Sequence, residues 1–154
     1  MTSPGVRIER LDGLPADRLA PLIVESEASG LRFVRRLAEE WESGDNRFDR
    51  AGEALFGALR GRRLLGVCGL NVDPYAGEPR VGRVRHLYVL TAYRRHGVGR
   101  QLLAAVIAAA HGSFATLRLG TTNPEAARLY EALGFRRHAG DARCTHVLEL
   151  AAVP

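Results

Sequence analysis

The sequence predicts an α/β (α+β) fold in which a mixed central sheet of about six or seven strands carries about four helices. Three observations support this prediction: apolar residues alternate in short runs, they recur at helical spacing in longer runs, and turn residues separate the runs. The expected order is β-α-α-β-β-β-α-β-α-β-β, and hairpins followed by two β-α steps favour a mixed sheet with helices on its faces. A length of 154 residues and an apolar content of 46% suit one domain over residues 1–154.

The first half of the chain predicts one strand, two helices and a hairpin. Pro15 lies near the start of the first helix, and Pro21 can kink or divide that helix. The second helix carries an apolar stripe that ends at Trp41, shortly before Gly44. Four residues, 60–63, form the turn of the hairpin. In chain order, the ranges are 6–11 (strand), about 14–27 and 31–42 (helices), and 54–59 and 64–72 (strands).

The second half predicts four more strands and two more helices. Asn123 is a good helix N-cap, and Pro124 suits the first helical position. Gly134 stands where a left-handed residue ends that helix. In chain order, the ranges are 81–90 (strand), about 97–110 (helix), 115–120 (strand), 123–133 (helix), and 135–138 and 144–150 (strands).

The composition limits the function classes. The net charge is +5, and the basic residues are all arginines. Without lysine, the chain cannot form the phosphate loop of nucleotide triphosphatases. The arginines are scattered and aromatic residues make up 6%, so we expect no nucleic-acid partner.

No apolar run is long enough to span a membrane, and residues 1–5 do not resemble a signal peptide, so we expect a cytoplasmic protein without a membrane partner. Cys68 and Cys144 lie in apolar runs and are expected to be buried, reduced residues. Cys144 and His146 share one strand face, but two ligands are too few for a metal site, and we expect no metal.

A glycine-containing loop follows the strand at 81–90. Its sequence is Arg94-Arg95-His96-Gly97-Val98-Gly99, and it leads into a helix. The first backbone N–H groups of a helix lack internal partners and attract anions, and glycines leave room for a diphosphate. Two alternatives remain: a helix start with incidental glycines, or a dinucleotide fingerprint, although that pattern's third glycine is absent.

Two segments together resemble the GNAT superfamily of N-acetyltransferases. Arg94-x-x-Gly97-x-Gly99, after a strand containing Leu87-x-Val89, is similar to the family's acetyl-CoA motif. The segment from Asn123 to Phe135 is similar to the family's later helix, with Asn123, Tyr130 and Gly134-Phe135 in order. The expected element order matches that fold over essentially the whole chain.

The resemblance implies an acetyl-CoA site between two strands that splay apart. Backbone groups of residues 87–89 would pair with the pantetheine, and Asn123 would contact it from the far side. Tyr130, on the same helix face as Asn123, would donate a proton to the departing thiolate. The implied cofactor-binding residues are Leu87, Tyr88, Val89, Arg94, Arg95, His96, Gly97, Val98, Gly99, Arg100 and Asn123.

The general base remains unassigned. The family often places a glutamate or histidine near positions that are Arg83, Arg85 and Arg118 here, and an arginine cannot act as a base. His86 alternates to the face opposite Leu87. Glu25 and Glu27, near the first helix–helix connection, are expected to be solvated surface charges rather than bases.

The predicted function is transfer of an acetyl group from acetyl-CoA to a primary amine by direct attack, without an acyl-enzyme. The missing base keeps a non-catalytic acyl-CoA sensor or interaction module as the alternative. A small molecule or a peptide can supply the amine. The first two helices and the last hairpin would shape the acceptor groove. A homodimer is compatible with the fold, and no feature of the sequence decides the oligomeric state.

Overall fold

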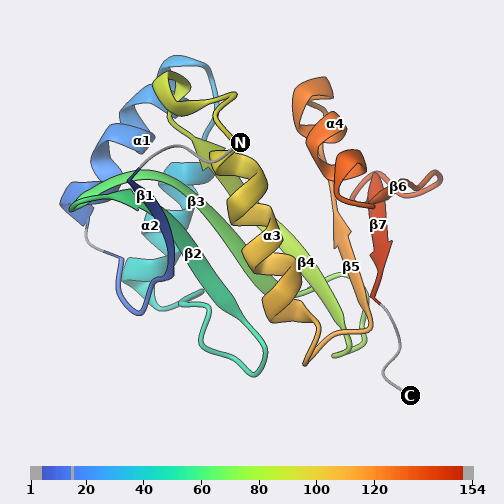
Figure 1. Ribbon diagram of the computed structural model, residues 1–154. Coiled ribbons are helices and arrows are strands. Elements are labelled where there is room, and N and C mark those ends of the chain that lie inside the picture. Colours follow the sequence, from blue (N-terminus) through green and yellow to red (C-terminus); the bar gives the residue numbers. More distant parts are fainter. Residues whose placement is uncertain (1–4, 15, 151–154) are drawn as a thin grey trace.

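The structure is a computed structural model that describes residues 5–14 and 16–150. It confirms the predicted fold class, because its described part forms a seven-stranded mixed sheet with four α-helices (Figure 1). The sheet order is β1-β2-β3-β4-β5-β7-β6. The elements are β1 (Val6–Arg10), α1 (Ala16–Ala28), α2 (Phe33–Ser43), β2 (Ala54–Arg60), β3 (Arg63–Val72), β4 (Val81–Val89), a 3₁₀ turn (Thr91–Tyr93), α3 (Val98–Ala110), β5 (Thr116–Leu119), α4 (Pro124–Ala132), β6 (Arg136–Arg137) and β7 (His146–Glu149).

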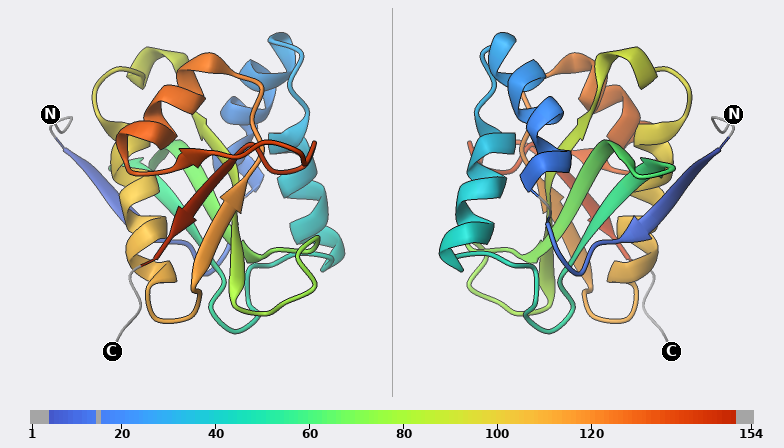
Figure 2. Two further views of the ribbon diagram at one scale, coloured as in Figure 1. Left: turned by 90° about the vertical axis from the view of Figure 1, so that its right-hand side faces the viewer. Right: turned by 90° about the vertical axis from the view of Figure 1, so that its left-hand side faces the viewer.

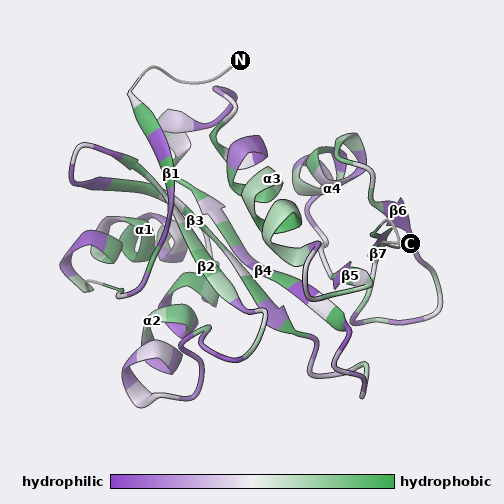
Figure 3. Ribbon diagram, turned by 60° about the horizontal axis from the view of Figure 1, so that its bottom comes forward, coloured by the Kyte–Doolittle hydropathy of each residue, from purple (hydrophilic) through white to green (hydrophobic). Residues whose placement is uncertain are grey.

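The helices cover both faces of the sheet. α1 and α2 lie on one face, and α3 and α4 lie on the other (Figure 2). Each face has its own buried cluster: Leu19 and Leu37 belong to the first, and Leu102 and Val106 to the second. Figure 3 shows hydrophobic residues along the central strands and on the helix sides that face them. Burial of this apolar surface is the main force that holds the layers together.

Local sequence signals determine where the helices end. Gly44 takes a left-handed φ of 86° and donates its N–H to the carbonyl of Trp41, which ends α2. Gly134, at φ 104°, follows α4 as predicted. Pro21 does not divide α1, which is continuous over its thirteen residues; Pro15 lies outside the described residues. No described helix is both long enough and apolar enough to cross a membrane.

Candidate active site

A cleft opens where β4 and β5 separate. Their parallel pairing covers Val81 to Arg83 of β4, opposite residues 116–118 of β5. β4 continues to Val89, whereas β5 ends at Leu119. Residues 84–89 therefore run along a cleft of about 920 Å³, beyond the end of the parallel pairing. This volume is within the range of small-molecule and cofactor sites.

The N-terminus of α3 lies at one end of the cleft. Gly97 occupies the N-cap position at φ 83°, a left-handed conformation that glycine adopts without steric cost. The first helical bond runs from the N–H of Gln101 to the carbonyl of Gly97, so the N–H groups of residues 98–100 have no acceptor within the helix. Those groups, the helix dipole and the neighbouring Arg94 and Arg100 make an anion-binding end.

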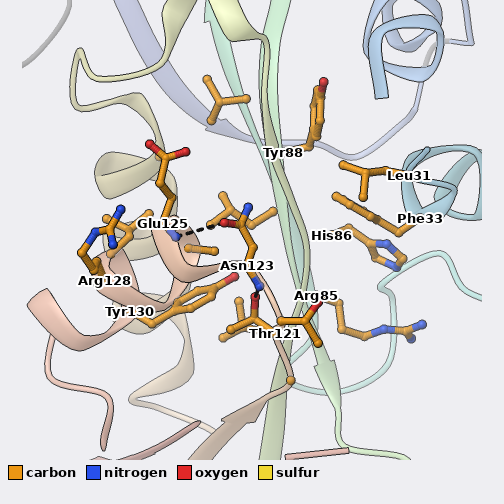
Figure 4. Close-up of a pocket in the computed structure, with 18 of the residues that line it drawn as sticks. Leu31, Phe33, Arg85, His86, Tyr88, Thr121, Asn123, Glu125, Arg128 and Tyr130 are labelled. Atoms are coloured by element: carbon orange, nitrogen blue, oxygen red, sulfur yellow. Dashed lines mark hydrogen bonds between the residues drawn. The ribbon is translucent and has the colours of Figure 1, made fainter. Parts of the chain in front are cut away.

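α4 lines one side of the cleft (Figure 4). The side-chain oxygen of Asn123 accepts the N–H of Glu125 at 3.0 Å, which confirms the predicted cap. The Tyr130 side chain is buried, and its ring packs against Phe135 and His146 at centroid distances of 5.7 and 6.3 Å. Its hydroxyl makes no hydrogen bond with any residue that the structure describes. Burial raises the pKa of Tyr130, so the hydroxyl stays protonated and free to donate.

The side of the cleft nearer α2 contains a β-bulge that the sequence did not predict. The β3–β4 pairing slips by one residue between Val67 and Gly69, and His86 adopts a positive φ of 61° at this point. The His86 ring lies near Phe33 and Phe48, with ring centroids 6.4 and 6.2 Å away. It nevertheless lines the cleft, on the side that Leu31 and Phe33 share (Figure 4).

His86 is buried with neither ring nitrogen bonded to any described residue. Burial and the charge of Arg85 lower the pKa of His86 to about 3, and the nearby backbone of Phe33 opposes this shift without forming a hydrogen bond of ordinary geometry. The imidazole is therefore neutral at pH 7. Leu87 packs against the α3-side core, so alternation predicted the relative orientation of the two side chains correctly. The cleft, however, is reached from both faces of the sheet, and His86 contributes to it.

Glu25 connects α1 to the end of β4. Its Oε1 accepts the Tyr88 hydroxyl at 2.7 Å, and the N–H and hydroxyl of Thr91 at 2.8 and 2.9 Å. Burial alone would raise the pKa of Glu25, but these hydrogen bonds and the charge of Arg94 lower it below the ordinary value. Glu25 thus remains at the surface and partly exposed, but it also has fixed partners and positions the strand end that lines the cleft. Glu27 instead pairs with an arginine of α2.

A second polar network supports the α4 wall. The Nε2 of His146 lies 2.8 Å from Glu131 Oε2, and its Nδ1 lies 2.9 Å from the hydroxyl oxygen of Thr145. That oxygen also accepts the N–H of Thr121 at 3.0 Å. All of these contacts are satisfied when Nε2 carries the proton and Thr145 donates to Nδ1. The network thereby ties α4 to the loop after β5, the two segments that carry Tyr130 and its neighbours.

A model of the acetyltransferase (GNAT) domain matches residues 51–137, which is more than half of the chain. The chain belongs to the GNAT family. A proposed acetyltransferase from Exiguobacterium sp. 255-15 has a similar structure, with 31% sequence identity and a TM-score of 0.83 over 94% of this chain and 93% of that chain.

More distant structures share the GNAT fold. A GNAT-family acetyltransferase from Staphylococcus aureus Mu50 is 17% identical, with a TM-score of 0.73 over 95% of this chain and 99% of that chain. A proposed acetyltransferase from Salmonella typhimurium, solved with its cofactor acetyl-CoA, is 18% identical, with a TM-score of 0.69 over 96% and 95% of the two chains. No curated protein matches the chain in sequence.

The GNAT cleft brings together most of the residues that the sequence singled out. His96 is exposed outside the cleft, and the Val98 side chain is buried in the core beneath α3, so Val98 can offer a ligand its backbone N–H alone. The other ten line the cleft: Leu87, Tyr88, Val89, Arg94, Arg95, Gly97, Gly99, Arg100, Asn123 and Tyr130. Leu31, Phe33 and Arg36 also line the cleft; they belong to the helical segment that was expected to shape the acceptor groove, but no sequence signal distinguished them individually.

Cys68 and Cys144 are buried and free, as predicted. Burial raises the pKa of the Cys68 thiol to about 12. A thiol that remains protonated at neutral pH is a poor nucleophile, which argues against an acyl-enzyme at this residue. Among the described residues, no group of three or more metal-ligating side chains occurs.

Proposed function

We propose that this GNAT protein transfers an acetyl group from acetyl-CoA to a primary amine by direct attack. One observation carries the proposal: the N-terminus of α3, the edge of β4 and the unbonded hydroxyl of Tyr130 all line one cleft. An anion-binding end and a proton donor along a single extended cleft are what a thioester of coenzyme A requires.

The residues of the cleft suit coenzyme A. The N–H groups of residues 98–100 would receive the diphosphate, with Arg95 and Arg100 adding charge at the rim. Gly99 also permits close packing, because a Cβ at this position would lie 3.3 Å from the Leu129 side chain. Backbone groups of residues 87–89 of β4 would pair with the pantetheine amides, as in strand addition. Asn123 would contact the pantetheine from the opposite wall.

The reaction forms a C–N bond and breaks the C–S bond of the thioester. The attacking amine must be neutral, and the departing sulfur must gain a proton. Tyr130 donates that proton or a hydrogen bond to the sulfur and regains the proton from solvent. The amine proton leaves to water. His86 can accept a hydrogen bond from the amine, but its low pKa makes it a weak base.

The test is release of free thiol from acetyl-CoA in the presence of a panel of primary amines. Turnover with at least one amine, together with an N-acetylated product in the mass spectrum, supports the proposal. Binding of coenzyme A without turnover across a broad panel would contradict it. That outcome would favour the alternative, a non-catalytic acyl-CoA sensor. This alternative is worth testing because no carboxylate lies near His86 among the described residues that line the cleft.

A further inference from the structure

The cleft has a second cationic end, away from the α3 N-terminus. Arg36, Arg83 and Arg85 line the part that His86 and Phe33 share. Arg83 has a carboxylate partner, since its Nη1 lies 3.6 Å from Asp73. Arg36 and Arg85 have no carboxylate within salt-bridge distance in the described part of the chain. The polar contact of Arg85 is a neutral one, 3.5 Å to the amide oxygen of Asn71.

These arginines are too far from the diphosphate end to serve it. Four residues of extended strand separate Arg85 from Val89, which is roughly 13 Å along β4. The Arg85 side chain also lies on the α2 face of the sheet, because it contacts Asn71, which pairs with Asn46 after α2. The cofactor-facing loop begins beyond Val89 and leads into α3 on the other face. The diphosphate of a bound coenzyme A would therefore leave Arg36 and Arg85 without an anionic partner.

A second observation at the same place points to a ligand. His86 is only 8% exposed, lines the cleft, and has no hydrogen-bond partner for either ring nitrogen among the described residues. Buried polar groups are rarely left unpaired in proteins, because desolvation without a partner is costly. A ligand that bonded to the imidazole would remove that cost. Leu31, which is 40% exposed, offers apolar surface on the same side of the cleft (Figure 4).

We propose that the acceptor is a small primary amine that also carries a carboxylate or phosphate, with the anionic group on Arg85 and Arg36 and the amine beside His86. This inference rests on the proposed acetyl transfer and narrows its substrate class. Arginine suits carboxylate and phosphate oxygens, since its planar guanidinium donates two parallel hydrogen bonds to either. A simple alkylamine or a polyamine would bring another positive charge to an uncompensated cationic wall, which disfavours it.

The test compares acceptors in matched pairs, measured by thiol release from acetyl-CoA. The pairs are γ-aminobutyrate with n-butylamine, phenylalanine with phenylalaninamide, and phosphoethanolamine with ethanolamine. In each pair, the anionic member carries a carboxylate or phosphate, and the neutral member lacks that group although its amine is protonated in solution. We expect kcat/KM for the anionic member to exceed that of the neutral member by about tenfold or more in at least one pair. The first two pairs report on a carboxylate and the third on a phosphate. Equal or better turnover of the neutral member in every pair would overturn the inference.

Two variants locate the effect. Arg85→Gln should reduce the anionic-to-neutral ratio of kcat/KM by about tenfold, because it removes a charged hydrogen bond. Arg62→Gln removes the same charge from the exposed β2–β3 turn and should leave the ratio unchanged. If Arg85→Gln does not fold, Arg36→Gln, at an exposed position of α2, should lower the ratio several-fold. An unchanged ratio in a folded variant would refute the assignment.

Calorimetry separates this inference from the proposed function. Wild-type protein loaded with coenzyme A is titrated with γ-aminobutyrate and with n-butylamine. Tighter binding of γ-aminobutyrate than of n-butylamine, with the difference lost in Arg85→Gln, supports the anion site even if no amine turns over. In that case the proposed acetyl transfer is refuted and the anion site is not. If amines without an anionic group turn over, and the anionic members show no advantage in rate or binding, the anion site is rejected while the proposed acetyl transfer stands.

Discussion

Tyr130→Phe tests the proposed chemistry directly, because it removes one oxygen and leaves the ring packing unchanged. The ring would keep its contacts with Phe135 and His146. Since the hydroxyl has no hydrogen-bond partner among the described residues, its loss strands no protein group, and the free energy of unfolding should change by less than about 1 kcal/mol. General acid catalysis contributes about 10²- to 10⁴-fold, so we expect kcat to fall by at least about 100-fold. That fall corresponds to roughly 2.7 kcal/mol of barrier.

The assay is steady-state thiol release, with coenzyme A affinity measured by calorimetry on the same protein. A role confined to the departing sulfur predicts a lower kcat with a nearly unchanged dissociation constant. Tyr93→Phe is the matched control: Tyr93 lies outside the cleft, beneath Arg60 and Arg63, and loses the same atom. The reasoning fails if Tyr130→Phe keeps most of its turnover, or if coenzyme A affinity falls in proportion to kcat.

The pH dependence of kcat is a second test of the role of Tyr130. Burial raises the pKa of Tyr130 above its ordinary value of 10, and the active form is the protonated one. Its contribution to kcat should therefore persist through pH 10 and decline at higher pH. A decline in wild-type kcat that begins well below pH 9 and is absent in Tyr130→Phe would contradict a phenol of raised pKa.

Three further predictions concern the residues around the cleft. Glu25→Gln should lower the free energy of unfolding by about 1 kcal/mol at pH 7, because neutral acceptors bond more weakly. The folded-state pKa of Glu25 lies below 4.5, so this difference should be fully present above pH 4.5 and shrink as the pH falls through the folded value, which chemical denaturation at several pH values would show. Gly97→Ala should cost about 1 kcal/mol at φ 83° and weaken coenzyme A binding, as thermal unfolding and calorimetry can measure. His146→Phe should strand the hydroxyl of Thr145, cost about 2 kcal/mol and lower Tm by about 4–8 °C, with unchanged Tm contradicting a supporting network.

The element order could be predicted because each boundary carries a local signal. β1, the β2–β3 hairpin and α3 begin and end within about one residue of their predicted limits, since alternation, turn residues and helical spacing all depend on short stretches of chain. The Asn123 cap and the Gly134 stop are local in the same sense. The last two strands are shorter than predicted, although single backbone hydrogen bonds such as His138 N–H to Thr145 O continue beyond their ends.

The acceptor side of the cleft could not be predicted in the same way. His86 lies at a one-residue bulge and adopts a positive φ, which is uncommon for a residue other than glycine and which no local sequence pattern signals. Leu31 and Phe33 reach the same place because α2 packs on β4, a contact between segments about fifty residues apart in sequence. Such contacts leave no periodic signal. The partners of Glu25 could not be predicted for the same reason, since Tyr88 and Thr91 lie more than sixty residues away in sequence.

The cleft has arginines where a general base would be expected. These arginines can themselves favour the neutral, unprotonated form of the substrate's amine. A positive charge near an ammonium group lowers the pKa of that ammonium, because like charges disfavour the protonated form. With the substrate's anionic group held by Arg85 and Arg36, its ammonium lies on the side of the cleft opposite α4, whereas the one carboxylate among the described lining residues, Glu125, belongs to α4 and pairs with Arg95. Deprotonation to water then needs no strong base, and a neutral His86 suffices to orient the amine by accepting a hydrogen bond. The same charges would thus select the acceptor by its anion and prepare its amine for attack, which makes Arg85 the residue whose removal should affect both binding and the pH dependence of kcat/KM.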